Sequence, residues 1–301
     1  MSDETTTALA EKVIEGEHYL ALGVHEGIPD KDYRSAPGIN RSYLDNVAIS
    51  PALALWRKLH PDPPTDAMNL GQALHTLVLE PHLFEERFVR SEFAAFTTKE
   101  AKDWRAAQTK TILRSHSPSG DLARDPSEWD RALAMGHAVR EHPIAGTLFK
   151  DDGPTELSIV WIDQYMPTRR RLCKGRLDKW CSGHQIIADL KKTRIAHAAM
   201  SEFARSVHTY RYDVQAAYYT DGAMQCGLRP RAFVFCVVEE DPPYQVACYT
   251  LPRVWLENGR RKYIRDLETL SECMESGDFQ SYPSEVRELA MPKFAEYNPI
   301  S

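Results

Sequence analysis

Two acidic residues and a lysine have the types and spacing that could do chemistry together. Asp178 lies in the run Arg171–Cys181, and Asp189 and Lys191 lie two apart in the apolar run that follows. The polar break at residues 182–184 predicts a β-hairpin. Because strand side chains alternate with a period of two, the three residues share one face if the hairpin loop has two or four residues.

The length of this loop decides the register. A two-residue loop places Asp178 opposite Ile187, a four-residue loop places it opposite Asp189, and a three-residue loop breaks the shared face. A further strand candidate, Thr155–Asp163, precedes the hairpin. If the polar connection after residue 163 closes these strands, Glu156 falls opposite Asp178.

An acid and a lysine two apart on a strand also form common cross-strand salt bridges on solvated faces, and the spacing alone leaves that alternative open. Three carboxylates beside one lysine would repel one another. A divalent cation removes that cost, and clustered oxygen ligands suit Mg²⁺, with Mn²⁺ as a substitute. Glu156, Asp178 and Asp189 therefore indicate a metal centre.

The charge of the chain is unevenly distributed. Its 301 residues are 43% hydrophobic and 27% charged, with a formal net charge of −6, which taken alone argues against a nucleic-acid partner. Between Thr168 and Arg194, however, nine basic residues stand against two acidic ones, a local excess of +7. A basic field around an acid cluster suits a polyanionic substrate, although an ordinary solvated basic face has the same composition. Lys192 and Arg194 in this segment, and Arg41 upstream, are candidates for phosphate contacts.

Two predicted helices carry polar residues that could join this centre. His75 lies in Met68–Leu79, and a histidine on a largely apolar helix is more often a core residue than a ligand. Gln215 and Tyr219 share one face of Tyr210–Cys226, where the pattern alone favours an amphipathic packing face.

Five sequence blocks make the chain resemble a known family. They run in order from about Gly38 to about Leu251, as GINRSYLDNVAISPALALW, LGQALHTLVLEP, GRLDKW, ADLKKT and YDVQAAYYTDG. The acid core resembles the PD-(D/E)xK nucleases. The surrounding blocks resemble their RecE-type branch, the exodeoxyribonuclease VIII-like domain of recombination systems in phages and prophages.

This resemblance implies a metal-ligand set and a division of roles. It implies that His75 joins Asp178 and Asp189 as a metal ligand, and we expect the Leu190 carbonyl to be a further one. Glu156 would bind a second ion or an ion-bound water.

The remaining roles concern the attacking water and the DNA. Lys191 would position or help deprotonate that water and offset the charge of the transition state. Gln215 and Tyr219 match the QxxxY motif of the RecB-like branch, with Tyr218 as a near alternative for the tyrosine. Gln215 would then orient the water or touch the phosphate, and Tyr219 would line the DNA path.

The resemblance also implies a substrate and partners. It implies digestion of linear double-stranded DNA from the 5′ end, which leaves 3′ single-stranded tails for annealing recombination. A ring-shaped homo-oligomer, such as a tetramer, and a single-strand annealing protein are the expected partners. The alternatives are an endonuclease on the same core and a DNA-binding protein without turnover, although no acid or lysine of the core is lost here.

The pattern of elements predicts an α/β fold, with a central mixed β-sheet flanked by helices and a helical N-terminal part. Strands are expected at Thr155–Asp163, Arg171–Cys181, Gln185–Lys191, Arg231–Glu239 and Tyr244–Leu251. Helices are expected at Leu9–Leu22, Ser42–Asn46, Pro51–Leu59, Met68–Leu79, Thr97–Ser115, Pro126–His142, Tyr210–Cys226 and Trp255–Met274. We expect residues 1–37, which are acidic, to form an appendage or a subunit contact, and residues 38–301 to form one nuclease-like domain.

The compartment follows from what the sequence lacks. No basic region followed by an apolar run opens the chain, and no apolar run approaches the length of a membrane span. The six cysteines show no CxxC spacing, and none precedes Cys173, which argues against the iron–sulfur cluster of some RecB-related nucleases. We therefore expect a cytoplasmic protein with reduced thiols.

Overall fold

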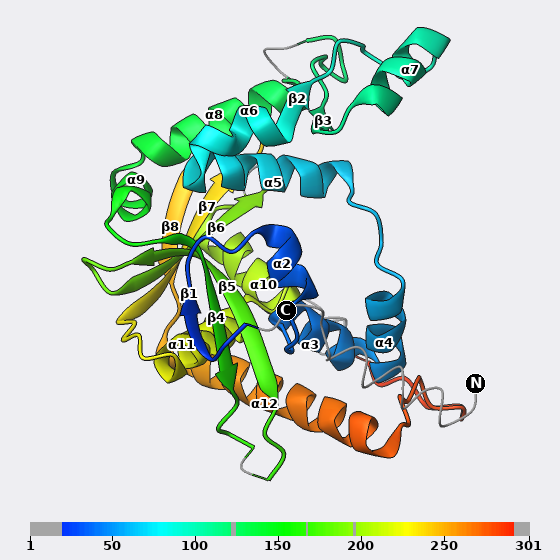
Figure 1. The fold of residues 1–301 in the computed structure, drawn as a ribbon, viewed down its shortest axis with the longest axis vertical. Helices are drawn as coiled ribbons and strands as arrows, with labels where there is room; N and C mark the ends of the chain where they lie inside the picture. Colours follow the sequence, from blue (N-terminus) through cyan, green and yellow to red (C-terminus); the bar gives the residue numbers. More distant parts are fainter. Residues whose placement is uncertain (1–19, 122–124, 167, 195–196, 292–301) are drawn as a thin grey trace, which may run out of the picture.

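A computed structural model describes residues 20–121, 125–166, 168–194 and 197–291. Its centre is a six-stranded sheet in the order β1-β4-β5-β6-β7-β8, with helices on both faces (Figure 1). The strands are β1 Gly23–His25, β4 Thr155–Ile162, β5 Leu172–Cys181, β6 Ile186–Thr193, β7 Ala232–Glu239 and β8 Val246–Thr250. The five strands expected from the sequence are all present.

The pairing of the strands makes the sheet mixed. β6 and β7 are parallel, and the other neighbouring pairs of this sheet are antiparallel. Cys181 lies opposite Ile186, so the hairpin loop has four residues, 182–185. If the same register is extended along the strands, Asp178 falls opposite Asp189, as expected for a four-residue loop. Thr155 lies opposite Lys179 in β4 and β5, as the predicted placement of Glu156 near Asp178 requires.

Helices make up most of the rest of the described chain. Their bounds are α2 Asp30–Ser35, α3 Arg41–Ile49, α4 Pro51–Leu59, α5 Asp66–Leu79, η1 Pro81–Leu83, α6 Phe84–Arg87, α7 Lys99–Ala107, α8 Glu128–Glu141, α9 Pro143–Lys150, α10 Met200–Thr209, α11 Tyr212–Gln225 and α12 Arg253–Ser276. The α4 helix begins and ends at the predicted residues, with Ser50 capping Leu53 N and a proline at the first helical position. The short helices α2, α6, α9 and α10 are not predicted from the sequence.

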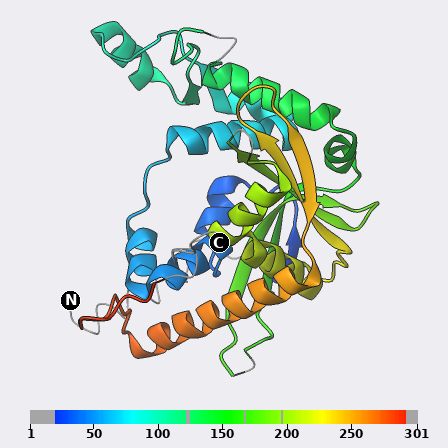
Figure 2. The same cartoon turned by 180° about the vertical axis from the view of Figure 1, so that it is seen from behind.

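Each face of the sheet has its own apolar core. On one face, α5, α8 and α9 pack on side chains that include Ala188 and Leu190 of β6. On the other face, α3, α11 and α12 pack on side chains that include Ile187 and Phe235. The two layers lie on opposite sides of the strands in Figure 1, and Figure 2 shows the same arrangement from behind. β6 is thus buried on both faces, which explains its apolar sequence.

The segment expected as one helix, Thr97–Ser115, is different in the structure. The α7 helix ends at Ala107, and the strand β3, Thr111–Leu113, pairs in parallel with β2, Phe88–Arg90. The two β-branched residues of β3 favour a strand, and the partner that stabilises it lies more than 20 residues upstream. The predicted helix is therefore too long, because local periodicity does not show that residues 111–113 pair with a distant strand.

The described part of residues 1–37 belongs to the main fold and does not form the separate appendage expected from its charge. The strand β1 extends the central sheet beside β4. The end of α2 is tied to β5, because the buried Lys174 ammonium donates to the carbonyls of Tyr33 at 2.7 Å and Ala36 at 2.5 Å. Most of the predicted helix Leu9–Leu22 lies outside the described residues.

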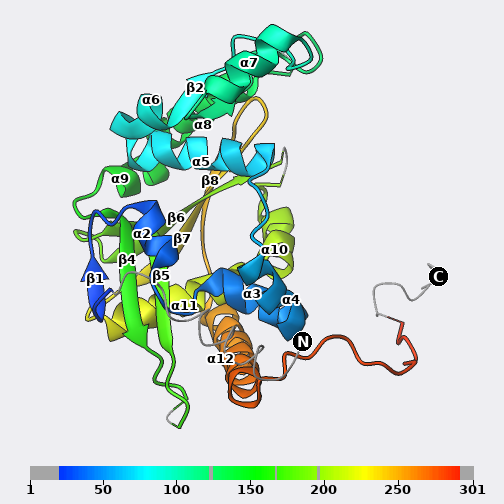
Figure 3. The same ribbon diagram turned by 45° about the vertical axis from the view of Figure 1, so that its right-hand side comes forward.

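The C-terminal part of the described chain leaves the body after α12. Gly277 ends that helix with a φ of 72°, a left-handed conformation that glycine adopts at little cost. The Gln280 carbonyl then accepts a hydrogen bond from Ala52 N at the start of α4. Beyond it the chain runs away from the helices (Figure 3). Among the described residues, no helix is long and apolar enough to cross a membrane.

Candidate active site

The centre of the site is the point where β5 and β6 separate. Their recorded pairing ends at Lys179 opposite Ala188. One residue further, the Asp178 side chain takes the place of a strand partner, and its Oδ2 accepts a hydrogen bond from Leu190 N at 2.7 Å. The Asp178 carboxylate is therefore fixed by a backbone donor at the point where the pairing of the two strands ends.

The α5 helix brings His75 to this point. His75 Nε2 lies 3.0 Å from the Leu190 carbonyl, and because a carbonyl only accepts, Nε2 carries the proton. The Nδ1 lone pair is then free for a ligand and lies 3.7 Å from Asp178 Oδ2. The Leu190 carbonyl orients the imidazole, as outer partners of metal-binding histidines do. A carbonyl oxygen has two lone pairs, so this contact is compatible with its predicted role as a metal ligand.

Glu156 completes a group of three possible ligands. One ligand atom each of His75, Glu156 and Asp178 can be chosen so that all lie within 4.8 Å of one another. Glu156 has a φ of 50°, an uncommon left-handed conformation for a residue with a side chain. The β4–β5 register is the same on both sides of this residue, but Glu156 itself is not paired, so the backbone is locally irregular beside the site.

Burial, and secondly the nearby Asp178 carboxylate, raise the pKa of Glu156 to about 8, against the opposing effect of Arg176. The Arg176 Nη1 lies 3.8 Å from Glu156 Oε2 and does not balance both acids. A histidine nitrogen and two crowded carboxylates form a donor set that fits a divalent cation, since the cation would relieve their repulsion.

Asp189 and Lys191 form the adjoining half of the site on the α11 side of β6. Lys191 Nζ lies 2.5 Å from Asp189 Oδ2, and Gln215 Nε2 donates to Asp189 Oδ1. Burial raises the pKa of Asp189 to about 6, although Lys191 opposes the effect. Burial also disfavours the charged form of Lys191, but Asp189 and Asp178 outweigh it and raise the pKa of the lysine. Lys191 is therefore an ammonium group.

Of the predicted site residues, Asp189 lies beside the group of three and not within it. Both of its carboxylate oxygens contact protein side chains. Gln215 contacts Asp189, and its own Oε1 is buried without a hydrogen-bond partner among the described residues. A buried amide oxygen of this kind usually has a water or ligand as its partner.

The structure distinguishes the two candidate tyrosines. Tyr218 is buried, and its hydroxyl donates to the Ile39 carbonyl at 2.6 Å, so it holds α11 to the start of the fold. Tyr219 is half-buried and lies against Gly175, where an added Cβ would come within 3.0 Å of its ring. Tyr219 is thus the tyrosine with a partly open position, which favours it over Tyr218 for the predicted DNA path.

The predicted basic field is much weaker than its sequence suggests. Acids from distant segments neutralise several of its members, as Glu275 does for Arg171 and Glu240 for Lys192. Others are internal, with contacts to carbonyls or site acids, namely Lys174, Arg176, Lys179 and Lys191. Arg194 is exposed, and its contact with phosphate stays a prediction.

Arg41, the other predicted phosphate contact, is engaged within the protein. Its guanidinium donates to the Tyr210 carbonyl at 2.5 Å and lies 2.9 Å from Asp45. It therefore links α3 to the start of α11. Arg176 is predicted from the sequence only as a member of the basic field, and the structure places it beside Glu156.

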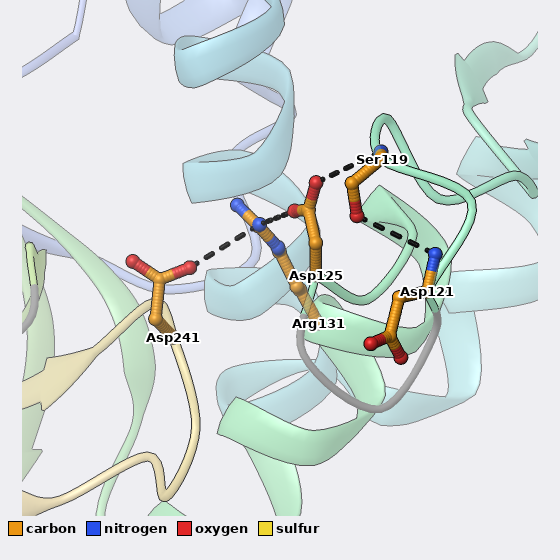
Figure 4. Close-up of a pocket in the computed structure, with 5 residues that line it drawn as sticks. All are labelled: Ser119, Asp121, Asp125, Arg131 and Asp241. Carbon is orange, nitrogen blue, oxygen red and sulfur yellow. Dashed lines mark hydrogen bonds and ion pairs between the residues drawn. The ribbon is translucent and has the colours of Figure 1, made fainter.

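A pocket of about 480 Å³ lies away from these residues (Figure 4). It is lined by Ser119, Asp121, Asp125, Arg131 and Asp241. Arg131 lies between two of the acids, 2.5 Å from Asp125 and 3.2 Å from Asp241. These ion pairs tie the loop before α8 to the turn between β7 and β8. The charged residues that line the pocket therefore stabilise the fold.

The mixed sheet and the acids where β5 and β6 separate define a member of the PD-(D/E)xK nuclease superfamily. Within it, the chain belongs to the family described as "PDDEXK-like domain of unknown function (DUF3799)", whose model matches residues 44–288. No curated protein matches the chain. A solved structure from Eubacterium rectale, described as a "Putative exonuclease", matches with a TM-score of 0.54 and 11% identity. The match covers 87% of this chain and 97% of that one, and at this identity it shows the fold alone.

Proposed function

We propose that the protein is a divalent-metal-dependent hydrolase of DNA phosphodiester bonds. The observation that supports this most directly is the approach of His75, Glu156 and Asp178 to within 4.8 Å of one another, beside the Asp189–Lys191 ion pair. A Mg²⁺ or Mn²⁺ ion held by these residues would supply Lewis acidity toward the scissile phosphate.

The other residues of the site would act on charge and position. His75, Asp178 and Glu156 hold the ion, and Asp189 is the ligand we place nearest to Lys191. The Lys191 ammonium lies where it can stabilise the negative charge that develops on the phosphate. Because its pKa is raised, this charge contact is the role we assign to it, in place of proton abstraction from water. Gln215 holds Asp189 in place.

We further propose that the enzyme digests the 5′-terminated strand of linear double-stranded DNA and leaves 3′ single-stranded tails. The support is the RecE-type resemblance of the sequence blocks, and the description of the Eubacterium rectale protein agrees with an exonuclease. Tyr219 and Arg194 are the residues we assign to the DNA path. We expect cleavage that does not depend on sequence, because neither residue that we assign to the DNA path belongs to an evident base-reading element.

The proposal includes a ring-shaped homo-oligomer and a single-strand annealing protein as partners. An exonuclease that encircles its strand dissociates only over an end, which favours digestion of many nucleotides in one encounter. Light scattering at micromolar concentration tests whether the protein forms a homo-oligomer. A mass of about 34 kDa, the mass of one chain, would contradict it.

The deciding experiment compares one plasmid in supercoiled and linearised forms, each with Mg²⁺ and with a chelator. We expect loss of the linear form in Mg²⁺, early loss of a 5′ label, late loss of a 3′ label, and survival of the closed circle. Nicking of the circle at a comparable rate would favour an endonuclease. Binding without cleavage of any form would favour a DNA-binding protein without turnover.

A further inference from the structure

An aromatic ring lies beneath the lysine of the site. Lys191 Nζ is positioned over the ring of Tyr212, 5.3 Å from its centroid. The Lys191 side chain is 18% exposed, and among the described residues its recorded ion-pair partner is Asp189, at 2.5 Å. The ammonium group therefore lies between a carboxylate and the face of an aromatic ring, a geometry in which both attract it.

The Tyr212 ring is held in place by other aromatic side chains. Phe235 on β7 stacks against it with a centroid distance of 5.6 Å, and Phe203 lies at 6.0 Å. Tyr212 is the first residue of α11, and Gln215 follows three residues later on the same face of that helix. One turn of α11 thus provides both a partner for Lys191 and a partner for Asp189.

The two partners of Lys191 differ in what else they can bind. Lysine carries its charge on a flexible four-carbon chain, which needs fixed contacts to hold it in one place. A carboxylate such as Asp189 is also a ligand for a divalent cation, so the metal and the lysine compete for it. The neutral face of a tyrosine ring is not subject to this competition.

We propose that Tyr212 is a positioning residue, whose ring holds the Lys191 ammonium toward the reacting phosphate when Asp189 serves the metal. This inference rests on the proposed hydrolysis of DNA. It assigns the effect to the ring and not to the hydroxyl group. Removal of the ring is therefore expected to impair turnover, and removal of the hydroxyl group is not.

Three variants separate these contributions. Tyr212→Leu removes the ring, and Tyr212→Phe keeps it. Tyr210→Leu is the matched control, because the Tyr210 ring lies tilted against Tyr212 at 5.7 Å and the residue is 59% exposed, and Lys191 lies over the Tyr212 ring. We expect kcat to fall about tenfold in Tyr212→Leu and to stay within about twofold in the other two, a size typical of a partly buried cation–π contact. The Kd for duplex DNA in Ca²⁺ should be unchanged in all three.

A second measurement does not depend on activity. A ring current shifts protons above an aromatic face upfield, so the CH₂ protons next to Nζ of Lys191 should show such a shift in a spectrum of protein with ¹³C-labelled lysine. The signal is assigned by its absence in Lys191→Arg. We expect the shift in the wild type and in Tyr212→Phe, with and without Mg²⁺, and its loss in Tyr212→Leu.

The possible results are distinguishable. Ordinary Lys191 shifts in the wild type would overturn the contact even if Tyr212→Leu failed to fold. Equal loss of kcat in Tyr212→Phe would move the role to the hydroxyl group, and a weakened Kd with unchanged kcat would make Tyr212 a DNA contact, so either result overturns the proposal. A wild type without hydrolysis would defeat the proposed function, whereas the spectrum would still decide the ring contact.

Discussion

The backbone N–H of Leu190 donates a hydrogen bond to the Asp178 carboxylate at 2.7 Å, across the gap where β5 and β6 separate. The carbonyl of the same residue accepts from His75 Nε2 at 3.0 Å. One peptide position of β6 therefore orients two of the three side chains that approach one another within 4.8 Å at the proposed metal site. Because both contacts use the backbone, the side chain of Leu190 remains available for the core under α5.

The first prediction concerns Lys191. Replacing it by alanine removes the ammonium that we place against the developing phosphate charge, and we expect hydrolysis to fall by about a hundredfold or more. Duplex binding in Ca²⁺ should persist. Single-turnover rates and filter binding measure the two effects. Lys99→Ala, on the exposed start of α7, is the charge-matched control. If Lys191→Ala kept more than about a tenth of the wild-type rate, the proposed role would be wrong.

The second prediction concerns the metal ligands. We expect His75→Gln, Glu156→Gln and Asp178→Asn each to weaken Mn²⁺ binding by about tenfold or more, since each removes one donor from the group. Titration calorimetry measures the affinity. Asp125→Asn is the control, because it removes an acid from the pocket around Arg131. Unchanged affinity in all three site variants would remove the proposed metal centre. We expect Asp189→Asn to weaken Mn²⁺ binding as well, and an unchanged affinity would make that carboxylate a partner of Lys191 alone.

Sequence reasoning reached the core of this site because the relevant residues are close in the chain. Asp178, Asp189 and Lys191 lie on two consecutive strands, and a period of two restricts their side chains to few arrangements. The exact register needed the structure, because the loop of residues 182–185 includes Gln185 with a φ of 57°, a conformation its residue type does not predict.

The ion pairs and polar contacts of the site were the hardest features to predict, because the two residues of each contact are distant in sequence. Arg171 was counted as part of a basic field, yet Glu275 of α12 pairs with it at 2.9 Å, 104 residues away. The contact of His75 in α5 with the Leu190 carbonyl likewise joins residues that are 115 positions apart. Both contacts depend on how helices pack on the sheet, and the local sequence pattern does not predict that packing.

The third prediction tests the packing that places α11. An added Cβ at Gly259 of α12 would lie 2.1 Å from the Asp213 carbonyl at the start of α11. Gly259→Ala must therefore push the two helices apart, and we expect it to lower the free energy of unfolding by about 1–3 kcal/mol. Denaturant titration measures this change.

Gly71→Ala is the matched control for that variant. Gly71 is also helical, and an added Cβ would meet only Lys192 Cε at 3.7 Å, an ordinary contact. Because alanine is the better helix former, this change should stabilise the protein by up to about 1 kcal/mol. Equal stability of the two variants would contradict the close approach of α12 to α11.

The last prediction follows from the pKa of Glu156, which burial and Asp178 raise from 4.5 to about 8. Between these two values the folded protein holds a proton at Glu156 that the unfolded chain has released. The stability that this proton contributes is fully present below pH 4.5, and it is lost as the pH rises to about 8. The metal-free protein should therefore melt at a lower temperature at pH 8 than at pH 6.

Glu156→Gln should flatten this dependence, because the amide does not titrate. Added Mg²⁺ should raise the melting temperature of the wild type more at pH 8 than at pH 6, since the ligand form of Glu156 is the carboxylate. Thermal melts with chelator and with Mg²⁺ measure both effects. Asp189 also titrates in this range, so the difference between wild type and variant is the relevant quantity. The same pH slope in both proteins would show that Glu156 is ionised as an ordinary surface acid.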